Sequence, residues 1–110
     1  MNIQVSESKQ VTVINVTGRV DSATAGELGS ALSQVIADNK INLVLDTSQV
    51  EYMSSAGLRE LVSALRKVKP RGGDLRLIQP SQRVLEVLDM AGLTTIFEIY
   101  AELTAAVDSY

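Results

Sequence analysis

The sequence predicts an α/β fold: a mixed, mostly parallel sheet with an antiparallel hairpin at its N-terminal edge and about four helices, in the order ββαβαβαβα. Two observations support this fold. Apolar residues alternate between helical periodicity and short strand-like runs, and strands that alternate with helices form parallel, right-handed crossovers. The first two apolar runs lie too close together for a crossover, so they can pair only as a hairpin. We therefore expect residues 1–110 to form one domain.

The N-terminal half is expected to hold the hairpin, one amphipathic helix and a buried central strand. In chain order, the expected elements are a strand at Ile3–Val5, a turn at Ser6–Gln10, a strand at Val11–Gly18, a helix with the inward stripe Ala25, Leu28, Leu32, Val35 and Ile36, a strand at Ile41–Leu45 and a polar connection at Asp46–Glu51. Either Asp21 or Ser22 can cap the first helix, since both residue types accept hydrogen bonds from free backbone N–H groups.

The C-terminal half is expected to hold three helices and two strands. In chain order, these are a helix at Ser55–Lys69 stopped by Pro70, a turn at Arg71–Asp74, a strand at Leu75–Ile78, a helix that opens at Pro80-Ser81 with Val84, Leu85, Leu88 and Ala91 inward and Gly92 after its end, a strand at Ile96–Tyr100, and a last helix with Leu103, Ala106, Val107 and Tyr110 on one stripe. The alternation of strand and helix continues to the end of the chain.

The segment Tyr52–Leu58 lies where the central loop becomes a helix N-terminus. A serine there can cap the helix, and either Ser54 or Ser55 fits this role. An anion there would meet free N–H groups and the positive end of the helix dipole. Gly57 allows another backbone or a bulky group to approach closely. The segment is therefore a candidate place for a phosphate or for a docked partner.

Composition excludes several function classes. The chain has no histidine and no cysteine, which removes the usual general base, the commonest metal ligand, and thiolate or disulfide chemistry. A net charge of −3 and the absence of tryptophan argue against a nucleic-acid binder. No apolar run is long enough for a membrane span, and the N-terminus does not resemble a signal peptide. We expect a cytoplasmic protein without a metal or other cofactor.

Three segments resemble parts of catalytic or binding motifs, and one segment is strongly basic. Ser-x-Gly resembles half of a nucleophile elbow, but Met53 stands where the first glycine should be and no histidine can complete a triad, which leaves only a Ser–Lys pair formally open. A dinucleotide site needs more glycines than Gly18 alone supplies. A phosphoacceptor role for Asp46 would need an acidic cluster that the sequence lacks, so a loop or cap role is favoured. The basic run Arg59–Arg71 is interpreted as a solvated helix face.

Several of these features together resemble one known family. They are the element order, Gly18-x-x-Asp21 before the first helix, the strand end Leu43–Asp46, and the segment Tyr52–Leu58. This combination is similar to the STAS domain family, which contains the bacterial anti-sigma factor antagonists and a related domain of sulphate transporters. The resemblance covers nearly the whole chain, and the serine–glycine segment is its most specific part.

The resemblance implies a non-enzymatic protein-interaction switch. In that family an unphosphorylated antagonist binds an anti-sigma factor that is itself a serine kinase, and phosphorylation of the antagonist breaks the complex. A metal-dependent serine phosphatase of the PP2C type resets the switch. The implied phosphoacceptor is Ser55, two places before the glycine. The implied partner-binding residues are Asp21, Met53, Ser54, Ala56, Gly57 and Leu58.

Two positions depart from the pattern of sporulation-type members. Ser54 stands where many have aspartate, and Ala56 stands where they have a second serine. The acceptor is retained, but the identity of the kinase stays open and Ser54 becomes a competing site. Two alternative functions also stay open: a STAS adaptor in another kinase–phosphatase cascade or an accessory subunit of a membrane transporter, and an enzyme or nucleotide binder.

Overall fold

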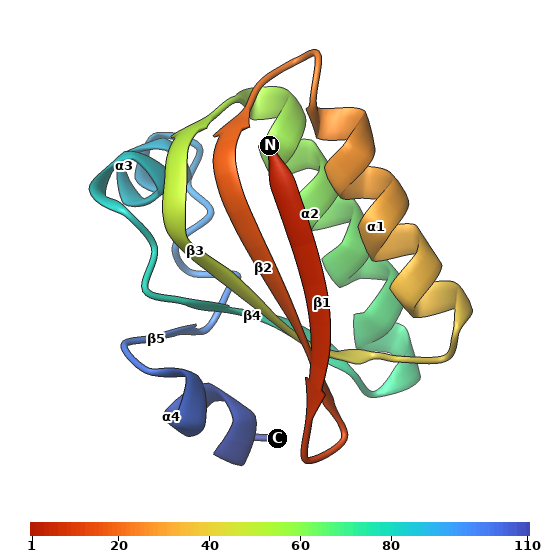
Figure 1. Ribbon diagram of the computed structural model, residues 1–110. Helices are drawn as coiled ribbons and strands as arrows, with labels where there is room; N and C mark the ends of the chain where they lie inside the picture. The colour runs from red at the N-terminus through yellow and green to blue at the C-terminus, as the bar shows by residue number, and fades with distance from the viewer.

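The computed structural model describes residues 1–110 and confirms the predicted mixed sheet and element order. Five strands lie in the order β1-β2-β3-β4-β5, with β1 antiparallel to β2 and every other neighbouring pair parallel. The elements are β1 (Asn2–Ser8), β2 (Val11–Val20), α1 (Ala25–Ala37), β3 (Asn42–Met53), α2 (Ser55–Val68), a 3-10 turn (Lys69–Arg71), β4 (Asp74–Ile78), α3 (Gln82–Met90), β5 (Ile99–Tyr100) and α4 (Leu103–Asp108) (Figure 1).

The N-terminal hairpin is tighter than the sequence predicts. β1 continues to Ser8, which pairs with Val11, so the connecting turn consists of Lys9 and Gln10 rather than Ser6–Gln10. Both turn residues have positive φ, at 51° and 68°. Two consecutive left-handed residues give the backbone twist that matches two right-handed strands, and this geometry closes the hairpin in two residues.

The central strand β3 is more than twice as long as predicted, and the expected polar connection at Asp46–Glu51 is wrong. β2 supplies a parallel partner for β3 as far as Met53, with register shifts that leave extra β3 residues after Asp46 and after Val50. β4 pairs with β3 only up to Asp46. The rest of that edge of β3 meets α3, where the Ser81 hydroxyl donates to the carbonyl of Val50 (2.8 Å). Asp46, Ser48, Gln49 and Glu51 are tolerated because they are half-buried or exposed, whereas Thr47 is buried and its hydroxyl has no hydrogen-bond partner.

The helices cover both faces of the sheet, but unequally. α1 and α2 pack side by side on one face, and their inward residues join those of α3 and the strands in a cluster of 22 buried residues (Figure 1). α4 lies on the opposite face over a smaller cluster, which contains Val11, Val13, Val44, Ile78, Ala106 and Val107. Neighbouring strand residues contribute to different clusters, as the two-residue period of a strand requires.

The C-terminal region differs from the prediction in two details. β5 comprises only Ile99 and Tyr100, since the residues before it form a turn, and Ala91 is exposed rather than inward. α4 is fastened by the last residue of the chain: the Tyr110 hydroxyl lies within hydrogen-bond distance of the carbonyls of Leu43 and Asp74. The guanidinium of Arg76 stacks over the same ring, 4.0 Å from its centre. No helix is both long and apolar enough to cross a bilayer.

Candidate phosphorylation site and docking groove

The last residues of β2 and β3 bring the predicted site residues to one edge of the sheet. Val20 pairs with Met53, and the Ser54 N–H donates to the Val20 carbonyl (2.8 Å). Asp21 follows directly after Val20, and Ser55 follows directly after Ser54. The loop before α1 and the N-terminus of α2 therefore lie side by side, as parallel crossovers require.

The structure separates the roles of the two serines that the sequence leaves open. Ser54 is the N-cap of α2, and the Gly57 N–H donates to its side-chain oxygen (3.3 Å). Ser55 is the first helical residue; its side chain is exposed and makes no hydrogen bond with the protein. No acidic residue lies in the first turn of α2. Ser55 therefore has a free hydroxyl at a helix end that carries no compensating negative charge.

Gly57 is required by packing inside the chain rather than by an approaching partner. A Cβ atom at this position would lie 2.5 Å from Sδ of Met53 and 2.6 Å from Cγ1 of Val20. Both neighbours are buried in the main core. Among the residues predicted to bind a partner, Met53, Gly57 and Leu58 are thus largely covered by the fold, whereas Ser54 and Ala56 are half-buried.

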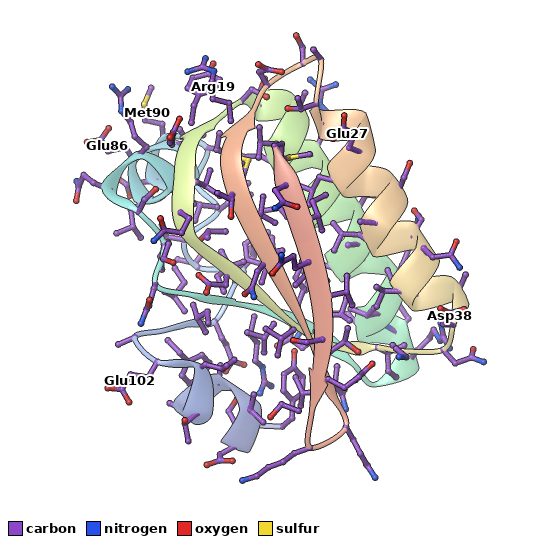
Figure 2. The ribbon with its side chains drawn as sticks, in the orientation of Figure 1. Arg19, Glu27, Asp38, Glu86, Met90 and Glu102 are labelled. Atoms are coloured by element: carbon purple, nitrogen blue, oxygen red, sulfur yellow. The ribbon has the colours of Figure 1, made fainter.

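An open groove of about 370 Å³ begins at Ser55 and runs between the start of α2 and the end of α3. Its lining residues are Tyr52, Met53, Ser54, Ser55, Leu58, Val87, Met90 and Ala91, of which six are hydrophobic. Met90 projects from the end of α3 with 89% of its surface exposed (Figure 2). A groove with an apolar floor and an exposed methionine at its rim suits an apolar side chain of a protein partner.

The contribution of α3 was missed by the sequence interpretation. Val84 and Leu88 form the buried stripe of α3, and the apolar pattern of this helix predicts only a role in the core. A second apolar row runs through Val84, Val87 and Met90 at three-residue spacing. This row is the signal that could have indicated a surface role, because it turns away from the core stripe along the helix.

Asp21 is held by its own loop rather than capping α1 directly. The N-cap of α1 is Thr24, and the carboxylate of Asp21 accepts hydrogen bonds from the N–H groups of Ala23 (3.0 Å) and Thr24 (3.1 Å). The bond from Thr24 does most to lower the pKa of Asp21 below its ordinary value, and the nearby charge of Arg19 acts in the same direction. Asp21 therefore stays ionised at neutral pH beside the start of α2.

Other sequence candidates have structural roles. The Asp46 side chain accepts a hydrogen bond from the Ser48 N–H (3.0 Å) where β3 changes register with β2. Gly72 has a φ of 85° and ends the 3-10 turn, while Gly73 packs directly against the carbonyl of Ile41. The structure contains no cluster of three or more acidic, histidine or cysteine side chains that could hold a metal ion.

Comparison with known proteins identifies the family of this chain. The family model for the STAS domain matches residues 2–106. The anti-sigma-B factor antagonist of Bacillus subtilis is 30% identical over 102 residues, which are 93% of each chain, and that of Listeria monocytogenes is 32% identical over 102 residues, or 90% of each chain. The crystal structure of an anti-sigma factor antagonist from Mycobacterium paratuberculosis superposes with a TM-score of 0.89 at 29% identity, over 98% of this chain and 92% of that one. The chain belongs to the STAS domain family.

Proposed function

We propose that this chain is an anti-sigma factor antagonist that acts as a phosphorylation-controlled protein-interaction switch. In its unmodified form it binds an anti-sigma factor that is a serine kinase, and it performs no catalysis itself. Transfer of phosphate from ATP to Ser55 releases it, and a serine phosphatase of the PP2C type restores the binding form. In this function residues 1–110 act as one STAS domain, and the switch operates in the cytoplasm, where the kinase has ATP.

The proposal depends chiefly on the difference between the two serines. The side-chain oxygen of Ser54 accepts the capping hydrogen bond of α2, whereas the Ser55 hydroxyl is exposed and makes no hydrogen bond at the rim of an apolar groove. A kinase needs an accessible hydroxyl, and only Ser55 offers one without loss of the helix cap. The relatives in Bacillus subtilis and Listeria monocytogenes are anti-sigma-B factor antagonists, which supports the choice of an anti-sigma factor as partner.

The position of Ser55 makes a phosphate harmless to the fold and harmful to a complex. At a helix N-terminus a dianion interacts favourably with free N–H groups, worth about 0.3–1 kcal/mol, and Asp21 nearby offsets part of this by repulsion. In a closed interface the same group must lose its water shell without a matching cation, at a cost of several kcal/mol. Since each 1.4 kcal/mol is tenfold in affinity, binding should weaken by about a thousandfold.

The experiment uses matched variants of the adjacent serines. Wild type, Ser55→Ala and Ser54→Ala are incubated with anti-sigma factor kinases from the same genome, with and without Mg-ATP, and complexes are measured by isothermal titration calorimetry and size exclusion. All three should bind. ATP should release the wild type and Ser54→Ala but leave Ser55→Ala bound, because only that variant lacks the acceptor.

Mass spectrometry of the released protein identifies the modified residue. We expect phosphate on Ser55. Phosphate on Ser54 alone would contradict the assignment, and so would equal release of Ser55→Ala by ATP. If none of the kinases bound the unmodified chain, the antagonist function itself would be rejected.

A further inference from the structure

Arg19 lies beside the groove and has no role in the function proposed above. Strand register pairs it with Tyr52, and its guanidinium lies 4.6 Å from the centre of the Tyr52 ring. Its Nε is 4.0 Å from a carboxylate oxygen of Asp21, and 60% of the side chain is exposed. A cation–aromatic contact and an ion pair of this length are both weak at an exposed site. Arg19 is thus held loosely enough to change partners.

Arg19 is also the cation most directly connected to the groove. Tyr52 and Ser55 line the same groove, and no other arginine or lysine side chain stacks on, or forms a side-chain hydrogen bond with, a residue of its lining. Arg59 and Arg83, on the neighbouring helices, form no ion pair. Figure 2 shows Arg19 projecting at the same end of the molecule as Met90.

We propose that Arg19 is the internal counter-ion of phosphorylated Ser55, and this inference rests on the function proposed above. The guanidinium leaves Asp21 and the Tyr52 ring and pairs with the phosphate. A phosphate attracts arginine more strongly than a single carboxylate, because it carries a larger charge and has three strong acceptor oxygens rather than two. The Asp21 carboxylate loses little stabilisation when Arg19 leaves, since it keeps the hydrogen bonds from the N–H groups of Ala23 and Thr24.

The exchange changes the surface that a partner meets. In the unmodified chain an exposed arginine, weakly paired with Asp21, stacks on Tyr52 beside the groove. After modification that positive charge is neutralised and one face of the ring is uncovered. A partner that offers a carboxylate to Arg19 therefore loses this contact in addition to meeting the phosphate.

The experiment installs phosphoserine at position 55 during translation, so that no kinase is needed. The phosphate is titrated by ³¹P NMR in the wild type and in the variants Arg19→Gln, Arg59→Gln and Arg83→Gln. A paired arginine lowers the second pKa of the phosphate, which is about 6 when unpaired. We expect Arg19→Gln to raise this pKa by about half a unit, a threefold change in proton affinity. Arg83→Gln, with the same charge change, should leave it unaltered.

Two results would overturn the assignment. One is a phosphate pKa that does not respond to Arg19→Gln. The other is a response to Arg59→Gln alone, because Arg59 lies four residues after Ser55 on α2 and helical spacing also brings it near. A second readout is the Tyr52 ring signal, which should shift on phosphorylation in the wild type and much less in Arg19→Gln.

Measuring the partner affinity of the phosphoserine protein separates the test of the counter-ion from the test of the switch. If phosphoserine weakens binding but the phosphate pKa ignores Arg19, the counter-ion role is wrong and the switch stands. If phosphoserine leaves affinity unchanged while the pKa responds to Arg19, the counter-ion exists and the switch is wrong.

Discussion

Replacing Gly57 by alanine tests the packing beneath the candidate phosphorylation site. The added Cβ would lie 2.5 Å from Sδ of Met53 and 2.6 Å from Cγ1 of Val20. The exposed fractions of these two side chains are 1% and 0%. Val20 is β-branched and fixed in a paired strand, so it cannot turn away by changing rotamer. The start of α2 must therefore move away from the sheet, or Met53 must leave its place in the core.

The matched control is Gly26→Ala, in the first turn of α1. A Cβ at Gly26 meets no atom within 4 Å, and neither glycine has a positive φ. Both variants gain up to about 1 kcal/mol from replacing glycine by alanine in a helix. Only Gly57→Ala also suffers overpacking, which costs about 1–3 kcal/mol. Gly26→Ala should therefore be more stable than Gly57→Ala by about 1–3 kcal/mol, whatever the exact helix propensity is.

Urea titration at pH 7, followed by circular dichroism, measures the difference. Gly26→Ala should shift the midpoint upward from the wild type, and Gly57→Ala should shift it downward or leave it near the wild type, with unchanged slopes. Backbone NMR shifts should change around Ser55 in the second variant only. Equal stability of the two variants would refute the reasoning, because it would mean that Val20 and Met53 yield without cost.

Three further predictions concern single contacts. Ser54→Ala should lower the free energy of unfolding by about 1 kcal/mol, since the Gly57 N–H loses its acceptor, while Ser55→Ala should stay within 0.5 kcal/mol of the wild type in the same urea titration. Tyr110→Phe should cost about 1 kcal/mol through the lost hydroxyl bonds to β3 and β4, and an unchanged midpoint would contradict the fastening of α4. The pKa of Asp21 is lower in the folded than in the unfolded state, so ionised Asp21 stabilises the fold. This stabilisation is complete above the unfolded pKa of about 4 and is lost as pH falls through the folded pKa. In Asp21→Asn the free energy of unfolding, measured by urea titration at several pH values, should therefore fall less steeply below pH 4.

The order of elements could be predicted because each segment shows a clear period. The stripe of Leu58, Leu61 and Leu65 is helical, and the run Leu43–Leu45 is apolar throughout, so type and order follow from local pattern. The mixed, mostly parallel sheet then follows from the rule that alternating strands and helices form parallel crossovers. The type and order of the helices and strands depend on residues close together in the sequence, so they can be predicted from the sequence alone.

The second half of β3 could not be predicted because its register shifts hide the strand period. The buried residues there are Thr47, Val50 and Met53, three apart rather than two. That spacing resembles a helix or an irregular segment, and only pairing with β2 makes it a strand. The two serines were ambiguous for a related reason. Which of them caps α2 depends on where the helix begins, and ends are less well determined by sequence than periods are.

The groove at Ser55 exists because β3 extends beyond β4. β4 stops pairing at Asp46, and the uncovered edge of β3 is taken by α3, which the Ser81 hydroxyl ties to Val50. This placement brings the end of α3, with Met90, beside the start of α2. The walls of the groove thus belong to elements anchored in the main core, and Ser55 lies on the rim with its hydroxyl free. A phosphate on Ser55 breaks no buried contact, so it lowers the affinity for a partner docked in the groove and leaves the fold intact.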